Sequence, residues 1–111
     1  MIDGLWTVEF EGVPNFLGGG VVVLAGNRLY GGDSQYYYTG LYDVKDGSFT
    51  AMAEITSFVP APVTIFGTQE KQFGLRITGT IANDLIKATG ARADNPSLRL
   101  TMTIRKRASL P

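Results

Sequence analysis

The stretch that decides the fold reads Leu5-Trp6-Thr7-Val8-Glu9-Phe10-Glu11, in which apolar and polar side chains alternate. Strict alternation indicates a β-strand with one buried face, because successive side chains of a strand point to opposite sides. Trp6, Val8 and Phe10 therefore share the face that we expect to be buried. The same alternation returns near the end of the chain, in the run Leu98-Arg99-Leu100-Thr101-Met102-Thr103-Ile104-Arg105.

Six further strands are expected between these two, each bounded by residues that favour turns. The expected ranges are 17–25, 28–30, 36–43, 48–58, 72–82 and 85–91. Gly26-Asn27 and Asp46-Gly47 are signals of tight hairpin turns. The pattern indicates one all-β domain over residues 1–111, either a sandwich or an up-and-down barrel. Short connections favour an eight-stranded antiparallel barrel with at most one short helical turn near residues 60–71.

A closed barrel would bring the first strand beside the last, and the distribution of charge supports that arrangement. The chain has no net charge, but residues 1–71 hold eight acidic and three basic residues, whereas residues 72–111 hold two and seven. Outward Glu9 and Glu11 could then lie beside outward Arg99 and Arg105. Cross-strand ion pairs of this kind contribute about 0.2–1 kcal/mol each. The alternative interpretation is a basic patch that binds a partner.

The composition disfavours several classes of function. The chain has no histidine and no cysteine, which removes the usual general base, the thiol nucleophile and the commonest metal ligands. We therefore expect a protein that is not an enzyme and that uses no cofactor and no metal. The first residues lack the pattern of a signal peptide, and the longest apolar run, residues 21–25, is too short to span a membrane. With zero net charge, this predicts a cytoplasmic protein that binds neither a membrane nor nucleic acid directly.

An aromatic segment, Tyr36-Tyr37-Tyr38, lies at the start of the strand expected over residues 36–43. We expect Tyr36, Tyr38 and Tyr42 to point into the barrel. Tyr37 and Leu41 would then be apolar side chains on the outer face. Tyrosine suits binding sites and interfaces alike, because it combines an apolar ring with a polar tip.

A neighbouring apolar strand extends this outer surface. We expect Val22 and Leu24 to point outward beside Tyr37 and Leu41. In the alternative register, Val21 and Val23 would point outward instead. The simplest cover for an apolar outer face is a second copy of the chain, so we predict a homodimer.

The segment Gly31-Gly32-Asp33-Ser34 is expected to form a turn. Its glycines can adopt positive φ, and the Asp33 side chain can accept hydrogen bonds from nearby backbone N–H groups. The alternative interpretation is a small anion-binding nest of backbone N–H groups.

Several segments together resemble the GrlR-like family of type III secretion regulators, over nearly the whole chain. They are Asp3-Gly4-Leu5-Trp6, residues 20–24, Phe66-Gly67, and a signature made of Gly31, Gly32, Asp33, Ser34, Tyr38 and Gly40. The resemblance implies an eight-stranded, lipocalin-like barrel with an apolar interior that forms dimers. It also implies a negative regulator of transcription that acts by binding a helix-turn-helix activator.

Two functions follow as expectations: a regulator that binds a protein partner, and alternatively a carrier or sensor of a small apolar ligand inside the barrel. An eight-stranded barrel has an interior wide enough for packed side chains or for one small ligand. The residues expected to line it are Trp6, Val8, Phe10, Tyr38, Phe49, Ile55, Phe73, Leu75, Leu100 and Met102. These large side chains favour a filled interior, whereas Gly40, Ala51 and Ala53 favour some residual space.

Overall fold

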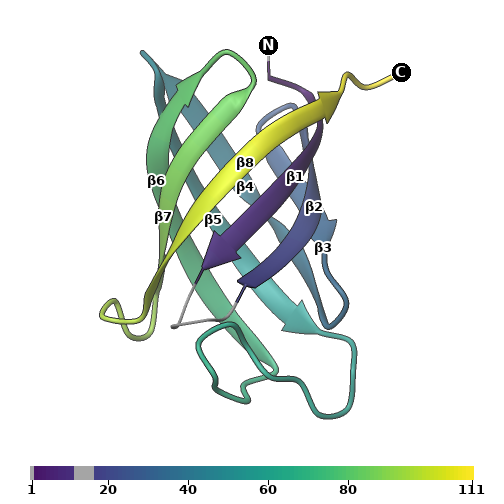
Figure 1. The fold of residues 1–111 in the computed structure, drawn as a ribbon, viewed down its shortest axis with the longest axis vertical. Helices are drawn as coiled ribbons and strands as arrows, with labels where there is room; N and C mark the ends of the chain where they lie inside the picture. The colour runs from purple at the N-terminus through teal and green to yellow at the C-terminus, as the bar shows by residue number, and fades with distance from the viewer. Residues whose placement is uncertain (1, 12–16) are drawn as a thin grey trace.

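The computed structural model describes residues 2–11 and 17–111, with the backbone alone described for Glu11 and Leu17. In these ranges the chain closes into an eight-stranded antiparallel barrel without helices (Figure 1). The strands are β1 (Gly4–Glu11), β2 (Leu17–Ala25), β3 (Arg28–Gly32), β4 (Tyr36–Lys45), β5 (Ser48–Ser57), β6 (Gln72–Ala82), β7 (Leu85–Arg92) and β8 (Arg99–Ala108). The fold class predicted from the sequence is confirmed.

Each strand pairs with its neighbours in the chain, which gives the up-and-down topology. The β2–β3 hairpin turns through Gly26 and Asn27, whose φ angles are 55° and 69°. The β4–β5 hairpin turns through Asp46 and Gly47, with φ angles of 53° and 79°. Positive φ at both central residues is typical of the type I′ turn, which matches the twist of the flanking strands. Both predicted hairpin turns are therefore confirmed.

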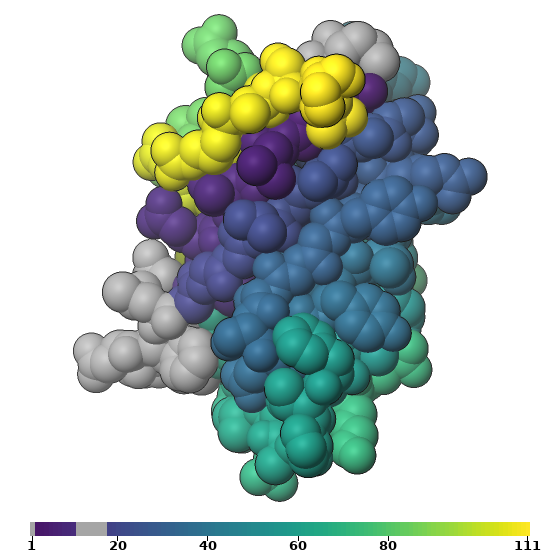
Figure 2. All heavy atoms as spheres, turned by 90° about the vertical axis from the view of Figure 1, so that its right-hand side faces the viewer, coloured from purple at the N-terminus to yellow at the C-terminus, as the bar shows by residue number. Residues whose placement is uncertain are grey.

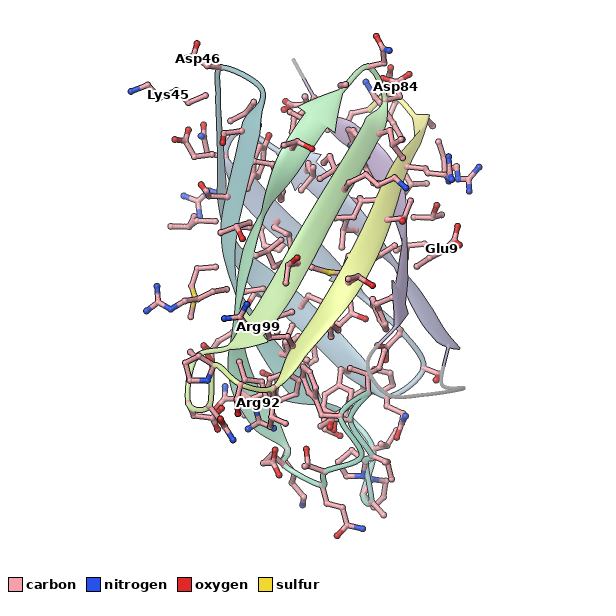
Figure 3. The ribbon with its side chains drawn as sticks, turned by 60° about the vertical axis from the view of Figure 1, so that its left-hand side comes forward. Glu9, Lys45, Asp46, Asp84, Arg92 and Arg99 are labelled. Atoms are coloured by element: carbon pink, nitrogen blue, oxygen red, sulfur yellow. The ribbon has the colours of Figure 1, made fainter. Side chains whose placement is uncertain are left out.

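The barrel closes where β1 pairs with β8, as Figure 1 shows at the front of the molecule. Outside this seam, Glu9 Oε1 lies 3.9 Å from Arg105 Nε, and both side chains are exposed. Figure 3 shows Glu9 pointing away from the barrel into solvent. An exposed pair of this kind contributes little to stability. The second predicted pair involves the Glu11 side chain, which lies outside the described residues.

Strand β4 presents its aromatic residues as the alternation predicts. Tyr36, Tyr38 and Tyr42 are buried inside the barrel. Tyr37 and Leu41 lie on the outer face and are 46% and 62% exposed.

The prediction for β2 was wrong: Val22 and Leu24 point into the barrel and are 5% and 1% exposed. Trp6 and Val22 lie directly opposite each other across β1 and β2, so they share the inner face. Val21 is exposed on the outer face, as the alternative register predicts. Because β2 is apolar on both faces, its own residues could not decide between the registers.

The glycines of the signature segment are not turn residues. Gly31 and Gly32 belong to β3, and neither has a positive φ. A Cβ atom at Gly31 would lie 2.0 Å from the carbonyl oxygen of Val21, so the glycine permits the close approach of β2 and β3. The turn itself begins at Asp33, whose Oδ1 accepts the backbone N–H groups of Gln35 at 2.8 Å and Tyr36 at 2.9 Å. The prediction that Asp33 locks a turn is confirmed.

Residues 58–71 connect β5 to β6 by a loop at the lower end of the barrel in Figure 1. The loop contains a tight turn, in which Thr64 N–H donates to Thr68 O at 2.7 Å and Gly67 N–H donates to Thr64 O at 2.9 Å. In the part of the chain that the structure describes, no helix is long and apolar enough to cross a membrane.

Candidate ligand site in the barrel interior

The end of the barrel opposite loop 58–71, which is the upper end in Figure 1, is filled with side chains. Trp6 and Ile86 are fully buried there, and the rings of Tyr42 and Phe49 are stacked with centroids 5.9 Å apart. Trp6 Nε1 donates a hydrogen bond to the carbonyl oxygen of Ile2 at 2.9 Å, so the N-terminal segment is tied across this end. The upper end therefore forms a packed core that closes the barrel.

The remainder of the interior contains a cavity of about 250 Å³ that is partly open to solvent. Its wall consists mainly of apolar side chains from the inner faces of the strands, joined by residues of the β3–β4 turn and of loop 58–71. The strand residues of the wall are Val8, Phe10, Gly18, Gly19, Val22, Leu24, Leu29, Tyr36, Tyr38, Phe49, Ala53, Ile55, Phe73, Leu75, Ile77, Leu100, Met102 and Ile104. The interior is thus filled at one end and hollow at the other.

Small residues explain why this part of the barrel stays open. Ala53 is buried and faces the cavity, where a larger side chain would occupy the space. Gly18 makes room for a neighbour instead, because a Cβ atom there would lie 2.8 Å from the Phe10 ring. The expected contribution of Ala53 to residual space is confirmed. Gly40 acts differently, because a Cβ atom there would lie 2.1 Å from the carbonyl oxygen of Met52. That glycine serves the approach of β4 to β5.

The lower end of the cavity is bounded by loop 58–71, which is attached to the barrel at two places. At the first, the side-chain amide of Gln35 forms two hydrogen bonds with the backbone of Val63. Gln35 Nε2 donates to the carbonyl oxygen at 3.2 Å, and Gln35 Oε1 accepts the N–H at 2.9 Å. In addition, the Tyr36 hydroxyl donates to the carbonyl oxygen of Glu70 at 3.0 Å. The loop is therefore fixed against the β3–β4 turn.

Arg92 makes the second attachment. It is the last inward residue of β7 and only 3% exposed, and Figure 3 shows it at the lower end of the barrel. Its guanidinium binds the carboxylates of Glu70 and Asp94, and its centre lies 4.6 Å from the centroid of the Phe73 ring. Such a buried charge requires partners of opposite charge, because removal from water is costly. The Arg92 cluster, defined as Arg92, Glu70 and Asp94, thus ties the loop to β7.

The ionisation of the Arg92 cluster reflects these contacts. The hydrogen bond from Arg92 holds the pKa of the Glu70 carboxyl below its ordinary value, and it does the same for the pKa of Asp94. The hydrogen bond to Asp94, followed by that to Glu70, raises the pKa of Arg92 against the opposing effect of burial. All three groups are therefore charged near neutral pH.

The cavity has one polar corner, at the β3–β4 turn. Asp33 and Tyr38 both line the cavity there, and the Tyr38 hydroxyl donates a hydrogen bond to Asp33 Oδ2. Burial, followed by the hydrogen bond to Asp33, raises the pKa of Tyr38 well above its ordinary value. The phenol is therefore protonated at every physiological pH, and its proton is directed at the carboxylate. The other wall residues with polar groups in their side chains are Ser34, Gln35, Tyr36 and Thr64.

Most of the cavity was predictable from the alternation of the strands. Nine of the ten residues expected to line the interior do line the cavity: Val8, Phe10, Tyr38, Phe49, Ile55, Phe73, Leu75, Leu100 and Met102. The exception is Trp6, which is buried inside the barrel at its filled end and does not border the cavity. Val22 and Leu24, expected outside, belong to the wall.

The loop residues of the wall were missed. They are Val63, Thr64, Ile65 and Phe66, which form part of the wall at the lower end of the cavity. Their segment has no alternation to indicate which side chains turn inward. The buried Arg92 was also missed, although Ile86, Ala88 and Gly90 precede it at every second position of β7.

The outer face of β2 to β5 carries a group of exposed apolar side chains, which we call the outer apolar face. Figure 2 views the barrel from the side of β2, β3 and β4, which carries much of this face. Its members are Val21, Tyr30, Tyr37, Leu41 and Met52. Two of these, Tyr37 and Leu41, were predicted from the sequence.

Comparison of the chain with protein-family models gives no match, and the search of curated proteins gives no significant match either. Within residues 2–11 and 17–111, no group of three or more acidic residues is arranged to hold a metal ion. The candidate functional site therefore rests on the geometry of the cavity.

Proposed function

We propose that this chain is a non-catalytic binding protein that takes up a small, mainly apolar ligand inside its barrel. The observation that carries the proposal is the cavity of about 250 Å³ between the filled end and loop 58–71. Closed barrels with one filled end and one hollow end are suited to this role, because the strands form a rigid apolar wall while loops at the open end admit the ligand.

The volume limits the size of the ligand. An apolar cavity of about 150 Å³ holds a benzene molecule, which corresponds to roughly 25 Å³ for each carbon atom. On this scale the cavity accommodates about ten non-hydrogen atoms. That excludes long-chain fatty acids and haem as full occupants. It favours a medium-chain or monocyclic compound.

Obstruction of the cavity tests the proposal. Ala53→Leu adds three carbon atoms, or about 75 Å³, to a side chain of the cavity wall. We expect octan-1-ol to raise the melting temperature of the wild-type protein, because a ligand that binds only the folded state adds about 2.7 kcal/mol at a hundredfold excess over Kd. Ala53→Leu should abolish that increase.

Met52→Leu is the matched control, since Met52 neighbours Ala53 in β5 but lies on the outer face. It should respond to the ligand as the wild type does. If octan-1-ol and comparable apolar compounds leave the wild-type melting temperature unchanged, the ligand-binding proposal is refuted. Equal responses of the wild type and Ala53→Leu would show that the ligand binds elsewhere.

The second candidate function is that of a GrlR-like negative regulator, which would bind a transcriptional activator in the cytoplasm. The outer apolar face supports it, because exposed apolar side chains grouped on one surface favour a protein contact. The same face supports a homodimer, which would have twice the 12.0 kDa mass of the chain. Analytical ultracentrifugation tests the dimer, and a monomer at micromolar concentration would count against it.

A further inference from the structure

We propose that the ligand carries a hydrogen-bond donor at one end, as an alkyl amine or alcohol does, and that the cavity rejects carboxylates. This inference rests on the proposed function and specifies its ligand class. It derives from the polar corner of the cavity, where Asp33 and Tyr38 lie side by side.

Asp33 retains capacity to accept a hydrogen bond. Its Oδ1 atom already accepts the backbone N–H groups of Gln35 and Tyr36, at 2.8 Å and 2.9 Å. Its Oδ2 atom accepts the Tyr38 hydroxyl. An ionised carboxylate offers about four lone-pair sites, two on each oxygen, so one site on Oδ2 remains after these three bonds.

The Tyr38 hydroxyl offers a second acceptor. Its single proton is given to Asp33, which leaves the oxygen lone pairs for another partner. The hydroxyl also lies close to the backbone of β2, because a Cβ atom at Gly20 would lie 2.9 Å from it. A donor group placed beside the Asp33–Tyr38 hydrogen bond would therefore face two oxygen atoms that can accept.

The other polar groups of the wall have little donor capacity to offer a ligand. One N–H of the Gln35 side-chain amide donates to the carbonyl oxygen of Val63, and the Tyr36 hydroxyl donates to the carbonyl oxygen of Glu70. The Thr64 and Thr68 hydroxyls are 2.7 Å apart and bond to each other. Ser34 is exposed at the end of the cavity, so a ligand would compete with water for its hydroxyl.

The charge of the cavity wall also favours a ligand with a hydrogen-bond donor over a carboxylate. Asp33 is the sole charged side chain among the described residues that line the cavity. Arg92, the nearest buried cation in the described part of the chain, is engaged by Glu70 and Asp94. A carboxylate ligand would thus approach Asp33 without a counter-ion, whereas an ammonium group would gain a charge-assisted hydrogen bond.

A series of ligands with the same number of carbon atoms tests the inference. Octylamine, octan-1-ol and octanoate each have eight carbon atoms, which fit the cavity, and they differ in the group at one end. At pH 7 the amine is cationic and the acid anionic. Calorimetric titration of the wild-type protein should give octylamine and octan-1-ol dissociation constants at least about tenfold lower than that of octanoate, because like charges in contact are strongly unfavourable.

Two variants identify the groups responsible. Asp33→Asn keeps the shape and the Oδ1 acceptor but removes the charge, so octylamine should lose at least about tenfold in affinity while octan-1-ol changes less. Tyr38→Phe removes the second acceptor and should weaken both donor ligands while leaving octane unaffected. The Tyr38→Phe variant preserves the Asp33 turn, so it remains informative if Asp33→Asn fails to fold.

The outcomes separate this inference from the proposed function. If octanoate binds as tightly as octylamine and octan-1-ol, the donor requirement is wrong, although the cavity still binds ligands. If none of the three compounds nor octane binds, the proposed function itself fails. If octylamine binds equally well to the wild type, Asp33→Asn and Ala53→Leu, its site lies outside the cavity and the inference is refuted.

Discussion

Replacement of Trp6 by alanine should destabilise the barrel more than any other single truncation of its inner face. The Trp6 side chain is fully buried in the filled end, among residues that have no open space into which to relax. Burial of a tryptophan removes about 200 Å² from water, and at about 25 cal/mol per Å² this contributes roughly 5 kcal/mol. Alanine retains a small part of that contribution.

The indole hydrogen bond adds a smaller loss. Trp6 Nε1 donates to the carbonyl oxygen of Ile2, and a bond of this kind contributes about 1 kcal/mol. Allowing for a denatured chain that is already partly compact, we expect Trp6→Ala to lower the free energy of unfolding by roughly 3–5 kcal/mol. Trp6→Phe keeps an aromatic ring and should show a smaller loss.

Urea denaturation followed by far-ultraviolet circular dichroism is the suitable assay. Trp6 is the only tryptophan of the chain, so its fluorescence is lost in the variant. Tyr37→Phe provides the control, because it removes only a hydroxyl from an aromatic residue on the outer face and should change the free energy of unfolding by about 0.5 kcal/mol or less. A loss below about 1 kcal/mol for Trp6→Ala would show that the filled end is not the packed core inferred from its burial.

Two further predictions concern the outer apolar face and the Arg92 cluster. Leu41 is 62% exposed on the outer apolar face. If this face forms a homodimer, Leu41→Lys should yield monomers in size-exclusion chromatography. An unchanged elution volume would exclude this face as the interface. Because Arg92 lowers the folded-state pKa of Glu70 and Asp94, their contribution to stability is present above the ordinary carboxyl pKa of about 4 and is lost as the pH falls through the lowered values. The melting temperature should therefore decrease as the pH is lowered from about 5 to about 2. The double variant Glu70→Gln/Asp94→Asn lacks both carboxylates, so its melting temperature should decrease by less over the same range. If the two proteins show the same dependence on pH, the Arg92 cluster does not stabilise the fold.

The differences between the predicted and the observed positions have two physical causes. Val22 and Leu24 lie in a strand that is apolar on both faces, so alternation could not show which face points inward. Trp6 was correctly assigned to the interior, but its position along the barrel axis decides whether it borders the cavity. That position depends on the tilt and stagger of all eight strands, which no single segment of sequence contains.

The sequence by itself determined the eight strands, their hairpin turns and the inner face of most of them, because a period of two and the φ preferences of glycine and asparagine are local properties. Tertiary structure alone decided where the barrel is hollow and which residues of loop 58–71 line the cavity. It also decided that Asp33 and Tyr38 form the polar corner of the cavity. The binding proposals depend on that enclosed volume, since a cavity is created by residues that are distant in the chain and by the small side chains that leave the space unfilled.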